Sequence, residues 1–178
     1  MQRDWVIIQD TREKKPLVFP HHITLLDDTK DPLSLKTCVS TLETVRQKMD
    51  AGDYTLQGFE DRMLVERKGS IREVATNCLD RRDRTRFLAA TQRLIDSCSR
   101  PILLLEGSPS QLFKAKLDVP VEAAVDALIR VLVAYKIELL LLPTSSSAQR
   151  RACGEWVARL LISGAVTNGS IPQHNADE

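Results

Sequence analysis

Short apolar runs and longer amphipathic segments alternate along most of this chain. Four runs are short and mostly apolar, as buried strands are: residues 5–9, 63–65, 101–107 and 137–142. Three longer segments repeat apolar residues at helical spacing: residues 87–98, 119–136 and 145–162. Strands that alternate with helices predict an α/β fold, in which helices cover both faces of a mixed central sheet.

The remaining segments are polar or ambiguous. Residues 16–36 are rich in proline, aspartate and lysine and predict a loop, and the charged residues 80–86 predict a connection. Ser70 followed by Glu73 is a capping box, which predicts that a helix begins after Ser70. Residues 37–50 leave two interpretations open, because their apolar positions fit a helical face and also the alternation of a strand.

Length and composition indicate one domain. The chain has 178 residues, 43% of them hydrophobic, which is enough for one real core and too little for two. Its four cysteines have neither metal-ligand spacing nor the pattern of a disulfide framework. The N-terminus lacks a signal-peptide pattern, and no apolar run is long enough to span a membrane. These features predict a cytoplasmic protein that does not enter a membrane.

The strongest candidate for chemistry lies at the end of one predicted strand. Side chains alternate along a strand, so Glu66 and Lys68 point to one side of the sheet and Arg67 to the other. Asp53 joins them if a hairpin that turns near Gly58 places it on the neighbouring strand. Two carboxylates can hold a hard divalent cation, and a lysine can help to activate the water that attacks a phosphodiester. Otherwise an acid and a lysine at this spacing are most often a solvated salt bridge.

Three short motifs follow one another along the chain: Asp10-Thr11-Arg12-Glu13, Gly52-Asp53 and Glu66-Arg67-Lys68. Together they resemble the motifs of the XPF-type structure-specific nucleases. The resemblance covers roughly the first 160 residues, the size of one domain. It implies a nuclease domain at 1–162, with a strand at 41–49, and we expect the tail at 163–178 to be disordered. The implied fold is a restriction-endonuclease-like three-layer sandwich with a variant of the PD-(D/E)xK active site.

The resemblance also implies an activity. The implied activity is that of a metal-dependent DNA endonuclease, which would act at branched DNA or at junctions between single and double strands, as in DNA repair or recombination. Asp53, Glu66 and Asp10 would then hold Mg²⁺ or Mn²⁺, and Lys68 would position or deprotonate the attacking water.

A basic stretch extends the candidate site. The net charge is only +1, but ten lysines and arginines stand against five acidic residues between Arg62 and Arg100. Such a run is usually a solvated surface; beside a phosphodiesterase motif it favours contact with a nucleic-acid backbone. The predicted DNA contacts are Arg67, Arg81, Arg82, Arg84, Arg86 and Arg93.

The chain departs from the family pattern at one position. Where the family has a final aspartate, this sequence has Arg72, and Glu73, one residue later, fits a capping role better than a catalytic one. The departure keeps an alternative open, namely a DNA-binding or scaffold subunit of the same fold with weak catalysis. A small-molecule enzyme is disfavoured, because the seven glycines form neither GxGxxG nor GxxxxGK[ST].

Two expectations concern partners. In the predicted helix at 145–162, Val157 and Leu161 widen the apolar stripe beyond what covering a sheet requires, and an exposed stripe of that kind marks an interface. Because related nucleases pair through their nuclease domains, we expect a homodimer through this helix. Many relatives carry a tandem helix-hairpin-helix domain, for which this chain has no room. DNA recognition would come from the domain itself, a second copy or a separate DNA-targeting protein.

Overall fold

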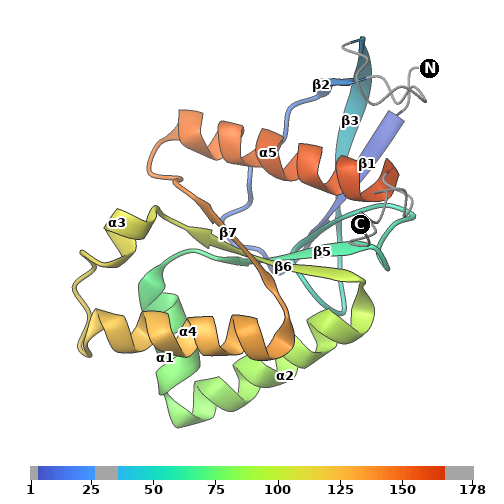
Figure 1. The fold of residues 1–178 in the computed structure, drawn as a ribbon. Coiled ribbons are helices and arrows are strands. Elements are labelled where there is room, and N and C mark those ends of the chain that lie inside the picture. Colours follow the sequence, from blue (N-terminus) through green and yellow to red (C-terminus); the bar gives the residue numbers. More distant parts are fainter. Residues whose placement is uncertain (1–3, 27–35, 167–178) are drawn as a thin grey trace, which may run out of the picture.

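The computed structural model describes residues 4–26 and 36–166, and these form a three-layer α/β sandwich (Figure 1). Its centre is a mixed seven-stranded sheet in the order β2-β3-β1-β4-β5-β6-β7. The strands are β1 (Asp4–Asp10), β2 (His22–Leu26), β3 (Thr37–Gln47), β4 (Tyr54–Leu56), β5 (Met63–Lys68), β6 (Arg100–Glu106) and β7 (Glu138–Leu142). The predicted fold class is confirmed, and the ambiguous segment before Gly52 is a strand.

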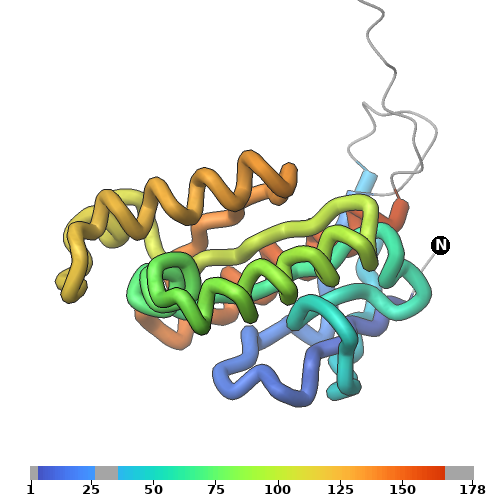
Figure 2. Tube along the Cα trace, turned by 90° about the horizontal axis from the view of Figure 1, so that it is seen from below, coloured from blue at the N-terminus to red at the C-terminus, as the bar shows by residue number. Residues whose placement is uncertain are grey.

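Helices cover both faces of the sheet, but unequally (Figures 1 and 2). Helix α5 (Ser147–Val166) lies over one face. On the other face lie α1 (Ile71–Leu79), α2 (Arg81–Ser97) and α4 (Val121–Tyr135). The short helix α3 (Pro109–Leu112) lies between β6 and α4 in the chain. None of the helices in the described part of the chain is both long and apolar enough to cross a membrane.

Alternation along the strands sends side chains into two separate cores. In β6, Ile102 and Leu104 pack beneath α5, whereas Leu103 and Leu105 pack against α1 and α4. All four side chains are buried. This explains the continuous apolar run of β6, which is parallel to both of its neighbours, β5 and β7.

The hairpin of β4 and β5 has the predicted form. Tyr54 pairs antiparallel with Val65, and Gly58 in the turn has a φ of +80°, which favours glycine. On its other side β4 pairs antiparallel with β1, where Tyr54 lies opposite Gln9. The end of β1, the start of β4 and the middle of β5 therefore meet at one place.

Two interpretations of the sequence are wrong. The predicted loop at 16–36 contains β2, which pairs antiparallel with β3. As an edge strand with a single buried residue, Ile23, it has little apolar pattern to reveal it. The predicted connection at 80–86 belongs mostly to α2. Asp80 alone separates the two helices, and its carboxylate accepts hydrogen bonds from the amides of residues 82 and 83, both at 2.9 Å.

Helix α5 is buried along much of its length. Val157 and Leu161 lie in the core between this helix and the sheet, so the apolar stripe that we expected to be in excess is used inside the domain. Gly154 permits a close approach, because a Cβ there would lie 2.1 Å from the Val18 carbonyl oxygen. Trp156, 56% exposed, lies on the outside. The helix continues to Val166, beyond its expected end, and residues 167–178 of the expected tail lie outside the described residues.

Candidate active site

Asp53 lies where β1, β4 and β5 meet. Gly52 before it has a φ of +72°, and a Cβ at Gly52 would lie 3.3 Å from the Cβ of Leu64, so glycine lets the turn pass close to β5. The Asp53 amide donates to the Val65 carbonyl at 2.8 Å, and the Asp53 carbonyl accepts from the Asp10 amide at 2.9 Å. Both neighbouring strands therefore hold the backbone of Asp53.

Glu66 and Lys68 lie together on the face of the sheet that α2 covers. The Lys68 ammonium is 2.8 Å from Glu66 Oε1 and 5.7 Å from the centre of the Phe87 ring of α2. Burial acts to lower the pKa of Lys68, but the carboxylates of Glu66 and Glu73 outweigh it and the pKa is raised. Lys68 is therefore charged at neutral pH in the metal-free protein.

Asp53 and Glu66 are close enough for their charges to repel each other. Burial, followed by repulsion from Glu66, raises the pKa of Asp53 from 3.8 to about 7. The Arg67 amide donates to Asp53 Oδ2 at 2.7 Å and acts in the opposite direction. A carboxyl group whose pKa is raised by burial and by a neighbouring charge is a common property of functional sites.

Without added metal, folding stability should fall as the pH rises from about 4 to about 7. The folded state binds the Asp53 proton more tightly than the unfolded chain does. Its contribution is therefore complete below the unfolded pKa and is lost as the pH rises through the folded pKa of about 7. The slope for one proton is at most about 1.4 kcal/mol per pH unit. Urea unfolding in EDTA tests this: Asp53→Asn should lack the slope, and equal slopes in both proteins would contradict it.

The backbone of Asp10 adjoins the site, but its carboxylate already accepts hydrogen bonds from other residues. The Arg12 side chain donates to both carboxylate oxygens, at 2.9 and 2.8 Å, and the Arg12 and Met49 amides donate at 2.6 and 2.8 Å. The side-chain hydrogen bonds from Arg12 are the main cause that lowers the pKa of Asp10 to about 2. Among residues 4–26 and 36–166, no three histidine, cysteine or acidic side chains are grouped to hold a metal ion. The expected cluster of three acids is therefore not assembled.

Arg67 points away from this site, into a buried ionic cluster on the α5 face. Its guanidinium donates to Glu106 at 2.6 Å and to Glu13 at 3.1 Å. Its side chain is only 6% exposed. The prediction that Arg67 contacts DNA is corrected accordingly, because a buried guanidinium held by two carboxylates does not reach a phosphate. Both partners are distant in sequence, so no local pattern revealed them.

Glu73 completes the surroundings of Lys68. Its Oε1 is 3.6 Å from the Lys68 ammonium, and its Oε2 accepts from the Gly69 amide at 2.9 Å. The Ser70 hydroxyl accepts from the Glu73 amide at 3.2 Å, so Ser70 caps the helix as predicted, while the Glu73 carboxylate reaches back to the Gly69 amide. Arg72, at the departing motif position, donates instead to a carbonyl in the segment after α3. Glu73 therefore brings a carboxylate to the lysine one position after the expected acid.

The five arginines of α2 are all exposed but do not share one surface. At about 100° per residue, Arg82, Arg86 and Arg93 lie within about 40° of one another on the helix. Arg81 and Arg84 point in other directions. We call the first three the basic face of α2.

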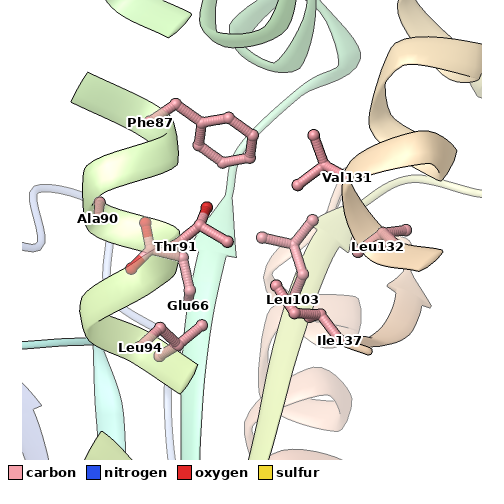
Figure 3. Close-up of a pocket in the computed structure, with 9 residues that line it drawn as sticks. All are labelled: Glu66, Phe87, Ala90, Thr91, Leu94, Leu103, Val131, Leu132 and Ile137. Carbon is pink, nitrogen blue, oxygen red and sulfur yellow. The ribbon is translucent and has the colours of Figure 1, made fainter. Parts of the chain in front are cut away.

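A narrow cleft opens beside Glu66, between α2 and α4 (Figure 3). Glu66 is the charged residue among its lining. The other lining residues are Phe87, Ala90, Thr91, Leu94, Leu103, Val131, Leu132 and Ile137. Apolar walls lower the local dielectric, which strengthens the interactions of Glu66 with its charged neighbours.

Two carboxylates are a ligand set that suits a small, hard cation. Mg²⁺ retains several waters and is usually bound by only one or two carboxylates. Asp53 and Glu66 supply two such groups, and their mutual repulsion is what a divalent cation would relieve.

Comparisons with known proteins identify the family of this chain and proteins of similar fold. A family model described as the ERCC4 domain matches residues 10–158, a span that contains all three motifs. The solved structure of XPF from Aeropyrum pernix is similar, with a TM-score of 0.57 and 16% identity, covering 92% of this chain and 63% of that chain. XPF from Aeropyrum pernix in complex with DNA has a TM-score of 0.56 and 19% identity, covering 92% and 68%. At these identities the likeness establishes a shared fold. A search of curated proteins found no match.

Proposed function

Since the chain belongs to the ERCC4 domain family, we propose that it is a metal-dependent DNA endonuclease. The observation that supports this best is the pair of carboxylates, Asp53 and Glu66, with the Lys68 ammonium 2.8 Å from Glu66. The Aeropyrum XPF of similar fold is described in a complex with DNA, and we extend that partner to this chain.

Each residue of the site has a separate proposed task. Asp53 and Glu66 would hold Mg²⁺ or Mn²⁺, which when bound stabilises negative charge developing on the phosphate. Lys68, kept charged by its neighbours, orients the attacking water and offsets the phosphate charge. Asp10, which the family resemblance assigned to the metal, holds Arg12 in place beside the acid pair.

The proposed substrate is DNA at a branch or at a junction between single and double strands, as arises in repair and recombination. Plain duplex, flapped duplex and splayed-arm DNA, each with Mg²⁺, Mn²⁺ or EDTA, test this directly. We expect cleavage only with metal and faster cleavage of the branched substrates. Equal cleavage rates on plain duplex would contradict the proposed preference for junctions. Cleavage in EDTA would contradict the proposed dependence on metal.

The basic face of α2 is the proposed DNA-contacting surface outside the acid pair. Replacing Arg82, Arg86 and Arg93 by alanine should lower the slope of log affinity against log salt by up to about 0.9 for each phosphate that is no longer neutralised. Replacing Arg81 and Arg84, which point elsewhere, should lower it less per residue. Fluorescence anisotropy over a salt series measures both slopes. An equal decrease per arginine in the two variants would show that no particular face of the helix contacts DNA.

A second candidate keeps the fold without efficient cleavage. A DNA-binding or scaffold subunit is favoured by Arg72 at the acidic motif position and by the lack of a third metal-ligating acid among the described residues. Metal-independent DNA binding without cleavage of any substrate would support this candidate.

We also propose that the protein forms a homodimer, through a surface that differs from the one predicted. Because the apolar side of α5 is internal, the interface has to use other apolar side chains that the structure exposes, and these include Trp156 on α5, Ile129 and Val133 on α4, and Leu139 on β7. In the described sheet β7 is an edge strand, and such apolar edges favour association. The interface would therefore centre on β7 and α4.

Sedimentation at micromolar concentration tests the dimer. Val133→Glu should dissociate it, whereas Val39→Glu, at an exposed valine on β3, should not. A monomeric wild-type protein, or a dimer that survives Val133→Glu, would contradict this interface.

A further inference from the structure

Arg67 contributes to the acid pair through its backbone. On the β4 side of β5 the strand pairing stops at Val65, and the Arg67 amide donates instead to Asp53 Oδ2 at 2.7 Å. The guanidinium of the same residue lies on the opposite face of the sheet. One residue therefore contacts Asp53 on one side of the strand and a buried ionic cluster on the other.

Glu106, the last residue of β6, is the centre of the cluster that holds this guanidinium. Its carboxylate accepts hydrogen bonds from Arg67, from the Thr144 hydroxyl and, at 3.4 Å, from Arg150 of α5. Arg150 also donates to two carbonyls of the segment after β1, at 2.6 and 2.9 Å. With Glu13, the cluster contains two arginines and two glutamates, so its charges balance. It connects β5, β6 and α5 with the segments that follow β1 and β7.

We infer that Glu106 is a positioning residue for Asp53, acting through the side chain and then the amide of Arg67. The inference rests on the proposed function, because it assigns the support of one proposed metal ligand. A guanidinium is planar and forms hydrogen bonds of fixed geometry, so a buried one restrains its own residue closely. Arg150 links this arrangement to α5, a helix on the face opposite the acid pair.

Binding of Mn²⁺ to the DNA-free protein, measured by calorimetry, tests the inference without relying on activity. Changes to groups that orient metal ligands cost about 10- to 100-fold in affinity. We expect about a tenfold loss for Glu106→Gln and for Arg150→Met, at the lower end because they act through Arg67. Arg159→Met is the matched control: Arg159 is also on α5, pairs with Glu155 at 2.6 Å and donates to the Thr24 carbonyl at 2.8 Å. It should bind Mn²⁺ as the wild type does.

The Arg67 amide provides an independent readout. Its ¹H–¹⁵N resonance in the metal-free protein should move in Glu106→Gln and in Arg150→Met, and stay in place in Arg159→Met. In an Asp53→Asn background, Glu106→Gln should weaken Mn²⁺ binding no further, because both changes act on the same ligand. If Glu106→Gln does not fold, Arg150→Met and Thr144→Val decide the question.

The outcomes separate this inference from the proposed function. Normal Mn²⁺ affinity and an unmoved Arg67 resonance in Arg150→Met would overturn the inference and leave the proposed function standing. A wild-type protein that binds no Mn²⁺ would overturn the metal-dependent function, and the Arg67 resonance alone would then decide whether Glu106 controls the amide at Asp53.

Discussion

DNA cleavage should fall by more than about 100-fold when Asp53 is replaced by asparagine or Glu66 by glutamine. Loss of a group that merely orients a metal ligand already costs about 10- to 100-fold, and these carboxylates are the proposed ligands themselves. Each amide keeps the shape of the side chain, so the loss reflects the missing charge. Single-turnover rates on a branched substrate at saturating Mg²⁺ measure it.

Folding stability separates lost chemistry from lost structure in these two variants. Asp53→Asn removes the repulsion from Glu66, so at neutral pH it should be at least as stable as the wild type. Asp96→Asn, at an exposed acid on α2, is the control and should cleave at the wild-type rate. A wild-type rate for Asp53→Asn or Glu66→Gln would show that this acid pair is not the active site.

The second large effect concerns stability. Arg67→Met should lower the free energy of unfolding by about 3–5 kcal/mol, which is the usual cost of leaving a buried charge without its partner. Glu13 and Glu106, 8% and 11% exposed, would both lose the guanidinium, and only Glu106 would keep a second cation, Arg150. At about 2–4 °C per kcal/mol for a domain of this size, Tm should fall by roughly 10 °C. Thermal unfolding followed by circular dichroism measures this.

A surface ion pair provides the comparison for Arg67→Met. Arg159 pairs with Glu155 while both side chains are more than 40% exposed, so Arg159→Met should cost at most about 1 kcal/mol. If Arg67→Met keeps its stability but lowers the salt dependence of DNA binding, then Arg67 contacts DNA as its sequence position first indicated. The Arg67 guanidinium would then not lie in the buried ionic cluster.

The parts of the site that lie within one hairpin could be predicted from local sequence. Alternation along β5 places Glu66 and Lys68 on one face and Arg67 on the other. Gly52 and Gly58 mark the two turns that bring Asp53 beside β5. These features depend on neighbours a few residues apart, and such neighbours are constrained by backbone geometry alone.

The hydrogen-bond and ionic partners of each side chain were less predictable. Asp10 seemed available to a metal because its sequence position matches a motif, yet Arg12 and the Met49 amide occupy its carboxylate. Glu73 seemed only to cap a helix, yet it also lies 3.6 Å from the Lys68 ammonium. A motif specifies which residue types are present, whereas hydrogen bonds with competing partners decide where each charge points.

The sequence by itself determined the α/β class, the β4–β5 hairpin and the face on which each residue of the Glu66–Lys68 stretch lies, because the periods of strands and helices are local properties. Only the tertiary structure decided that Glu106 and Arg150 meet Arg67, and that the apolar side of α5 is internal. Those contacts join segments 39 or more residues apart. Packing of the sheet against its helices creates them, and no local pattern encodes which distant charges will meet.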